Sequence, residues 1–120
     1  MAKQHQETWE IYTSAWKAIK EEDKRALFDK SLATNCIYRD PLIVADGWEA
    51  LVSYMLDFHK TIPGGYFVTR EFKSHNNRSI SEWDMRACDG TVIGVGISYA
   101  EYNRDGKLTS MTGFFDSNEE

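Results

Sequence analysis

The fold is decided by residues 66–116, which read YFVTREFKSHNNRSISEWDMRACDGTVIGVGISYAEYNRDGKLTSMTGFFD. Three turn signals interrupt this stretch: Asn76-Asn77, Asp89-Gly90 and Arg104-Asp105-Gly106. Between them lie four runs rich in β-branched and aromatic residues, at 66–75, 79–88, 91–103 and 107–116. Because short turns join antiparallel neighbours, the segment predicts a meander of four antiparallel strands.

The start of the chain predicts two helices. In the first, apolar residues repeat at helical spacing, at Trp9, Tyr12, Trp16 and Ile19. The acidic stretch 21–23 interrupts this pattern, and we expect Asp23 to cap a short second helix. The apolar residues of that helix are Ala26, Leu27 and Leu32.

A short strand and a third helix are expected between this pair and the meander. The strand covers residues 36–40 and stops at Pro41, which has no N–H to offer a ladder. Asp46 and Glu49 have capping-box spacing, and the helix after them holds Leu51, Met55, Phe58 and Ile62 on one face. The predicted fold class is α+β. We expect one domain over residues 1–120, in which three N-terminal helices cover a strongly curved antiparallel sheet.

Charge and composition exclude several kinds of partner. The net charge is −5, and Lys and Arg are scattered among acids instead of forming a basic stripe. No apolar run approaches the roughly 20 residues that span a bilayer, and the N-terminus lacks the apolar core of a signal peptide. We therefore expect no nucleic-acid partner, no membrane partner and a cytoplasmic location. Cys36 and Cys88 lack CxxC spacing, which favours packed, reduced thiols over a disulfide, with a reactive thiol as the open alternative.

The third run of the meander has two unlike sides. Ile93, Val95, Ile97 and Tyr99 alternate with Gly94, Gly96, Ser98 and Ala100. If the small side lines a cavity, the large side is an exposed apolar patch, and such patches usually mark interfaces. This predicts a homodimer through the outer face of the sheet. The glycines are equally compatible with bends that curve the sheet.

The order of elements resembles the nuclear-transport-factor-2-like (NTF2-like) superfamily, in particular its SnoaL-like polyketide cyclase and ketosteroid isomerase branch. The most specific pieces are Tyr38-Arg39-Asp40-Pro41, Asp46-Gly47-Trp48, Trp83, and Asp105-Gly106-Lys107-Leu108 leading to Met111 and Phe115. The resemblance covers nearly the whole chain and implies a cone-shaped, cystatin-like α+β roll. It implies less about function, because this fold hosts enzymes, binding modules and assembly scaffolds.

The resemblance implies a role for Asp40. In the isomerases, the aspartate of the Asp-Pro pair is the general base that moves a proton on a hydrophobic substrate. Their oxyanion donors, a tyrosine on the first helix and an aspartate on the penultimate strand, align with Ala15 and Ser98 here. The candidate catalytic residues are therefore Asp40 with Tyr12, Tyr38 or Ser98 as replacement donors. The simpler alternative is that the Asp40 carboxylate only caps the turn into Pro41.

A second group of side chains is expected to line a pocket for a small apolar molecule. These candidate ligand-binding residues are Trp16, Phe58, Trp83, Met85, Met111, Gly113 and Phe115. The alternative is that they form solid core.

Other kinds of site find little support. Glu82, Asp84 and Arg86 alternate with Trp83 and Met85, so the charged set should lie on the face opposite the pocket. An Asp-Arg-Asp cluster of the epoxide-hydrolase kind would need a slip of one residue. The three histidines share no ligand spacing, and no glycine motif opens a helix, so we expect no metal and no cofactor.

Two functions from different classes remain. One is a cofactor-free isomerase or cyclase that acts on a hydrophobic carbonyl compound through Asp40. The other is a non-catalytic dimer that binds a small apolar ligand or a protein partner.

Overall fold

The computed structural model describes residues 2–116 and contains three helices and six strands. In chain order the elements are α1 (Ala2–Lys17), α2 (Glu21–Ser31), β1 (Leu32–Asp40), β2 (Ile43–Asp46), α3 (Trp48–Thr61), β3 (Tyr66–His75), β4 (Arg78–Arg86), β5 (Val92–Tyr102) and β6 (Leu108–Phe114). They form one sheet with strand order β2-β1-β6-β5-β4-β3. The predicted α+β class and the meander of the last four strands are confirmed.

The meander follows from its turns. Asn76 and Asn77 adopt φ values of 47° and 60°, which suits a two-residue hairpin between β3 and β4. Gly90 and Gly106 lie in the two later turns with φ values of 90° and 82°, a conformation that glycine adopts at little cost. Because each connection is this short, each strand lies antiparallel beside the one before it.

The first half of the sheet differs from the prediction in three ways. The strand predicted at residues 36–40 begins at Leu32, and a second strand, β2, follows the turn at Pro41. β2 was missed because four residues carry too little alternation to be recognised, and only pairing with β1 makes them a strand. Since β1 runs parallel to β6, the sheet is mixed and not wholly antiparallel.

Neither predicted helix cap is present. α2 begins at Glu21, before Asp23, which then lies in the first turn, where its charge suits the helix dipole. α3 has Gly47 as its N-cap, because Asp46 is the last residue of β2 and pairs with Ile37. In both places an acid near a helix start was assigned as a cap, although pairing or an earlier start left it no such role.

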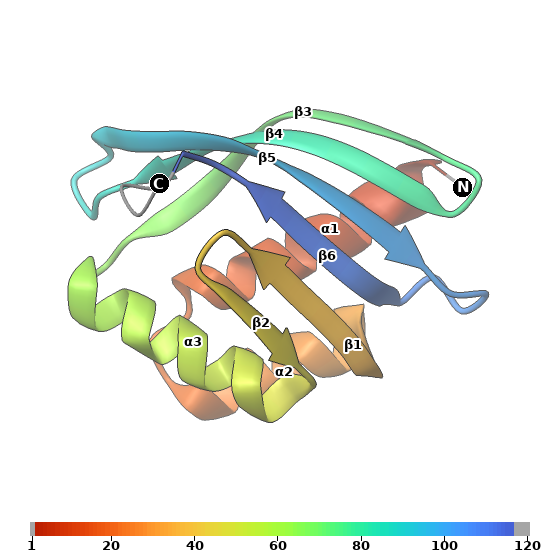
Figure 1. Cartoon of the computed structure of the whole chain (residues 1–120), viewed down its shortest axis with the longest axis horizontal. Helices are drawn as coiled ribbons and strands as arrows, with labels where there is room; N and C mark the ends of the chain where they lie inside the picture. Colours follow the sequence, from red (N-terminus) through yellow and green to blue (C-terminus); the bar gives the residue numbers. More distant parts are fainter. Residues whose placement is uncertain (1, 117–120) are drawn as a thin grey trace.

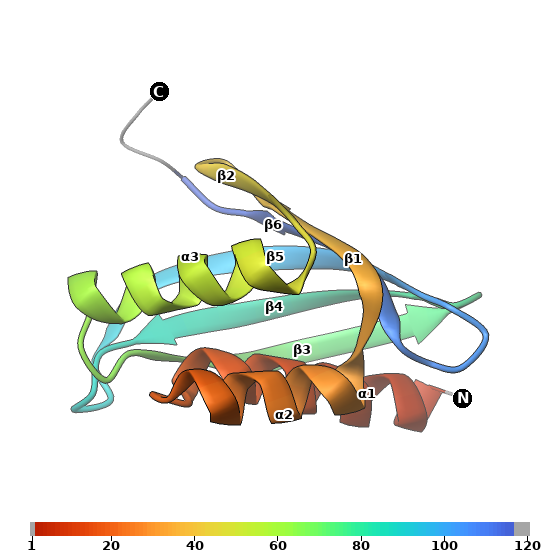
Figure 2. The ribbon, with the colours of Figure 1, turned by 90° about the horizontal axis from the view of Figure 1, so that it is seen from below.

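The helices lie on the concave side of the sheet. Figure 1 shows β3, β4 and β5 arching over α1, and Figure 2 shows α1 and α2 as a layer beneath the sheet with α3 beside it. The indole N–H of Trp9 on α1 donates to Thr69 on β3 at 3.1 Å, which ties the two layers together. Between the layers, the core is built from large side chains that include Phe28, Leu51, Met55 and Leu108. No helix within residues 2–116 is long and apolar enough to cross a bilayer.

Candidate functional site

A cavity of about 650 Å³ lies between α1, α3 and the concave face of the sheet. Its lining is dominated by aromatic rings contributed by both helices and by four strands or their ends. These rings are Trp9, Tyr12, Trp16, Tyr38, Tyr54, Phe58, Phe67, Trp83 and Phe115. A volume of this size is typical of a small-molecule site. These side chains therefore surround a cavity and do not form a solidly packed core.

Asp40 is the most heavily hydrogen-bonded side chain of this lining. One carboxylate oxygen, Oδ1, accepts the backbone N–H groups of Leu42 at 2.8 Å and Ile43 at 3.2 Å. The other, Oδ2, accepts the hydroxyls of Tyr38 at 2.6 Å and Tyr54 at 2.8 Å. The turn-capping interpretation of Asp40 is therefore correct for one oxygen, while the other faces the tyrosines. Because a carboxylate has about four lone-pair positions, these four donors fill it.

The three tyrosines near Asp40 remain protonated over a wide pH range. Burial raises the pKa of Tyr12, Tyr38 and Tyr54 above the ordinary phenol value, and the nearby Asp40 carboxylate raises each further. They act in this cavity as neutral hydroxyl groups.

Two hydroxyl groups of the lining, those of Tyr12 and Ser98, have an unused proton. Tyr12 Oη accepts the indole N–H of Trp16 at 3.0 Å, and Ser98 Oγ accepts that of Trp83 at 2.9 Å. An indole N–H can only donate, so the lone pairs of Tyr12 and Ser98 receive a bond while their own protons find no acceptor among the described residues. Both protons are available to a ligand, unlike those of Tyr38 and Tyr54.

Packing holds these groups in place. Trp16 is the centre of the aromatic cluster, with its ring centroid 5.3 to 5.9 Å from those of Tyr38, Tyr54, Phe58 and Phe67. The Trp83 indole lies so close to Gly96 that a Cβ added there would collide with its ring. Glycine at position 96 thus leaves the space that the indole occupies when it donates to Ser98.

Nine of the eleven predicted site residues line the cavity: Tyr12, Trp16, Tyr38, Asp40, Phe58, Trp83, Met85, Ser98 and Phe115. Met111 and Gly113 do not. Met111 is 1% exposed and packs in the core: its register beside Tyr38 and Ala100 puts it on the concave face, but other core side chains fill the space above it. Gly113 has no side chain to offer, and a Cβ added there would meet Asp40, Ser98 and Tyr38 at ordinary contact distances of 3.7 to 3.8 Å. Catalytic and binding roles for the other nine stay predictions.

Tyr54 is the main residue that sequence reasoning missed. It lies four positions before Phe58 on α3, so the two share a face of the helix, and both line the cavity. The helical pattern was assigned to Leu51, Met55 and Phe58, which hid the polar side chain on the same face. Only the tertiary contact with Asp40 distinguishes Tyr54 from an ordinary half-buried tyrosine.

The charged set of β4 lies on the opposite face, as the period of two predicts. Asp84 pairs with Arg70 at 2.7 Å and with Arg86 at 3.2 Å, away from the cavity that Trp83 and Met85 line. The epoxide-hydrolase alternative is therefore wrong. Within the described part of the chain, no cluster of three His, Cys, Asp or Glu side chains has the geometry of a metal site.

No protein-family model matches the chain, and no curated protein matches it. Solved structures do. A SnoaL-like family protein from Agrobacterium tumefaciens str. C58, described as a candidate isomerase, superposes with a TM-score of 0.86 at 26% identity, over 96% of this chain and 99% of that one. A candidate SnoaL-like polyketide cyclase from Jannaschia sp. CCS1 gives 0.76 at 12% identity, over 96% and 87% of the two chains.

A third protein, from Methylobium petroleophilum PM1, has a cystatin-like fold and unknown function. It gives a TM-score of 0.78 at 13% identity, over 100% of this chain and 80% of that one. The two matches at 12% and 13% identity speak for the fold alone. The predicted resemblance is confirmed: the chain has the cystatin-like α+β fold of the nuclear-transport-factor-2-like superfamily and is similar to a candidate SnoaL-like isomerase and, in fold, to a candidate SnoaL-like polyketide cyclase.

Proposed function

We propose that this protein is a small-molecule pocket protein of the cofactor-independent isomerase or cyclase type, in which Asp40 moves a proton on a hydrophobic carbonyl compound. One observation carries the proposal. A single aromatic cavity holds a carboxylate together with two hydroxyl groups, those of Tyr12 and Ser98, whose protons are uncommitted. Proton abstraction beside a carbonyl needs a base and a donor to the oxygen that becomes negative.

The step balances with the chain's own groups. Asp40 takes the proton from the carbon next to the carbonyl, and the electron pair moves onto the carbonyl oxygen. Tyr12 and Ser98 donate hydrogen bonds to that oxygen, and return of the proton to another carbon completes an isomerisation. Tyr12 makes up for Ala15, the residue aligned with the family's tyrosine, which has nothing to donate, and Ser98 stands at the position of the family's second aspartate.

The tyrosines bonded to Asp40 constrain this step. Because all four lone-pair positions of the carboxylate are occupied, one hydroxyl must move away before Asp40 can accept a proton. Opening one such bond costs about 1–3 kcal/mol, which a bound ligand can offset. Tyr54, on α3, and Tyr38, on β1, are the groups that can move, since the other two donors are backbone amides.

The test is hydrogen exchange of 2-tetralone, a bicyclic ketone. Its α-protons exchange with D₂O, and ¹H NMR follows the loss of their signal. We expect the wild-type protein to exceed the buffer rate and Asp40→Asn to lower this excess by about 100-fold or more. Calorimetry should find 2-tetralone binding changed by less than about threefold, because the ring contacts remain.

Asp46→Asn is the matched control. Asp46 is an exposed acid at the end of β2 in the same hairpin, outside the cavity lining. It should leave the exchange rate unchanged. Equal rates for Asp40→Asn and wild type would remove Asp40 from the mechanism.

A second candidate is a non-catalytic pocket that binds an apolar ligand. The observation that favours it is the filled hydrogen-bonding capacity of Asp40, which suits a carboxylate that holds Tyr38 and Tyr54 in position. This alternative predicts that 2-tetralone raises the melting temperature while its exchange stays at the buffer rate.

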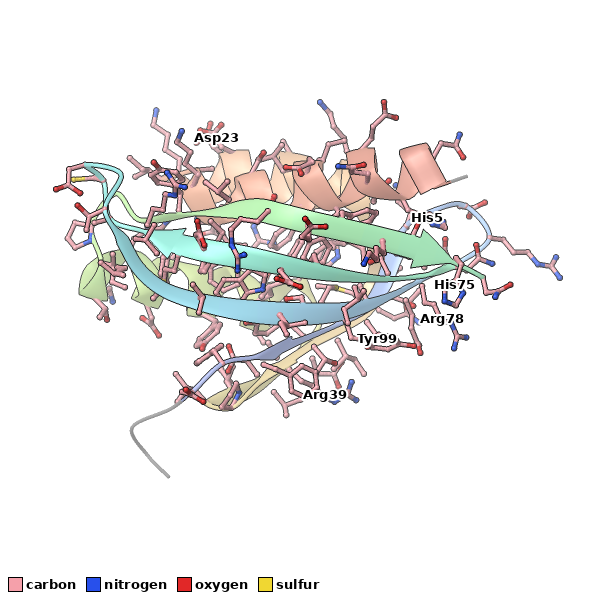
Figure 3. All side chains as sticks on the ribbon, turned by 90° about the horizontal axis from the view of Figure 1, so that it is seen from above. His5, Asp23, Arg39, His75, Arg78 and Tyr99 are labelled. Carbon is pink, nitrogen blue, oxygen red and sulfur yellow. The ribbon has the colours of Figure 1, made fainter. Side chains whose placement is uncertain are left out.

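We also propose a homodimer through the outer face of the sheet, and a cytoplasmic location. Ile97 and Phe114 pair across β5 and β6 and are 42% and 59% exposed, and Ile80 on β4 is 48% exposed on the same face. Figure 3 looks onto this face, where Tyr99, Arg39 and Arg78 are labelled. Aliphatic side chains with a rim of charges are typical of an interface between copies.

A further inference from the structure

We infer that the cavity selects ligands that carry a hydrogen-bond donor, a hydroxyl or an amino group, on an alicyclic or aromatic frame, and rejects carboxylates. The inference names the ligand class of the pocket proposed above. It rests on that pocket binding a small molecule and not on turnover.

The hydrogen bonds of Asp40 set the polarity of one wall. Tyr38 and Tyr54 each give their single hydroxyl proton to Asp40 Oδ2, at 2.6 and 2.8 Å. Both tyrosines line the cavity, so what each can still offer a ligand is an oxygen lone pair. A hydroxyl that donates to a carboxylate is also polarised, which makes its oxygen a better acceptor.

The opposite polarity is found at Tyr12 and Ser98. These hydroxyls accept indole N–H groups and keep their protons for a ligand. The cavity therefore has an acceptor pair at Tyr38 and Tyr54 and a donor pair at Tyr12 and Ser98. A ligand that satisfies both pairs has a donor group and an acceptor oxygen, whereas a plain ketone satisfies only the second.

The charges of the lining exclude anions. Its ionisable side chains, apart from the tyrosines, are Asp40, Asp57 and Asp116, and no Lys, Arg or His lines the cavity within the described residues. Nor does Asp40 have an ion-pair partner in that part of the chain, where its four donors are neutral groups. A ligand carboxylate would meet the like charge of Asp40, which no basic side chain in that part of the chain offsets.

Because the charged groups of the lining are acidic, a protonated amine is a more favourable donor group than a hydroxyl. The rings of Trp16, Tyr38 and Tyr54 pack against one another with centroids 5.8 to 5.9 Å apart, and all three line the cavity together with Asp40. Aromatic faces attract cations, and the carboxylate behind the tyrosines adds a longer-range attraction.

The test uses four tetralins that share one bicyclic frame and differ only at position 2: the alcohol, its methyl ether, the ammonium and the carboxylate. Isothermal titration calorimetry at pH 7 gives the dissociation constants. The alcohol should bind about 10-fold more tightly than the ether, which has lost its donor. The ammonium should bind at least as tightly as the alcohol, and the carboxylate about 10-fold more weakly or worse.

Three variants assign the effect. Tyr54→Phe and Tyr38→Phe keep the rings and remove one acceptor oxygen each, and at least one of them should reduce the preference for alcohol over ether to about threefold or less. Tyr99→Phe, on the outer face, should keep the wild-type preference. Circular dichroism melts establish that all three are folded at the temperature of the titration.

The outcomes separate this inference from the proposed function. Equal binding of alcohol and ether, a preference that survives in both cavity variants, or a carboxylate that binds as tightly as the alcohol overturns the ligand class while leaving a binding pocket. If none of the four tetralins binds and 2-tetralone does not bind either, the proposal that the cavity binds a small molecule is contradicted. The inferred ligand class then fails as well.

Discussion

The same strands form both faces of the sheet, but the two faces carry different kinds of side chain. On the concave face, Trp83 from β4 lies on Gly96 from β5, and the lining is aromatic with hydroxyl groups at fixed positions. On the convex face, Asp84 is clamped by two arginines while Ile97 and Phe114 are exposed. Alternation along each strand separates a face suited to a small ligand from one suited to a flat partner.

The two faces differ in which polar groups already have a hydrogen-bond or ion-pair partner within the protein. On the convex face charges pair with one another and leave aliphatic surface free. On the concave face the carboxylate of Asp40 is bonded only to neutral donors, so the bonding capacity left over belongs to hydroxyl groups. Three perturbations test this comparison.

The largest effect is expected from alkaline pH, which acts on the concave face. Tyr12, Tyr38 and Tyr54 have pKa values raised by burial, so above about pH 10 the unfolded chain has lost protons that the folded chain keeps. Stability present at neutral pH is therefore lost as pH rises, by about 1.4 kcal/mol per pH unit for each such tyrosine. Urea unfolding at pH 10.5 to 12 measures the slope. Tyr54→Phe should make it shallower, and an unchanged slope would mean that Tyr54 titrates like a solvated phenol.

A charge at the centre of the convex face should break the proposed dimer. Ile97→Glu places two carboxylates near the interface of each copy, since residue 97 lies beside Glu82 in the register. Bringing like charges together costs several kcal/mol, so the dissociation constant of the dimer should rise by about 100-fold or more. Sedimentation velocity over a range of protein concentrations measures this constant. A wild-type protein that stays monomeric at millimolar concentration would contradict the dimer.

The smallest effect is expected from a change on the concave face at Gly96. A methyl group at this position collides with Trp83, and overpacking of this kind costs about 1–3 kcal/mol of unfolding free energy. Gly96→Ala should also weaken 2-tetralone binding, since Trp83 must shift. Ile19→Ala, at a 71% exposed position between α1 and α2, is the control and should change stability by about 0.5 kcal/mol or less. If both variants melt alike, the contact between Gly96 and Trp83 is not a constraint.

Much of the candidate site could be predicted because it depends on strand period and on one motif. The sequence assigns Trp83 and Met85 to the cavity as large apolar side chains, alternation then places Asp84 on the other face, and both assignments are correct. Asp40 was found through the Asp-Pro pair. Met111 was misplaced because alternation gives the face of a residue but not whether the space above it is filled.

What the sequence determined by itself was local. Turn residues such as Asn76-Asn77 specified the meander, and the spacing of apolar residues specified the helices, because each signal acts over a few neighbouring positions. The tertiary structure alone decided which hydroxyl groups are free. Tyr54 meets Asp40 across 14 positions and Trp83 meets Ser98 across 15, and whether a proton is committed depends on such contacts between separate elements. No local sequence pattern encodes these contacts. The sequence therefore predicts the fold but not the arrangement of hydrogen-bond donors and acceptors in the cavity.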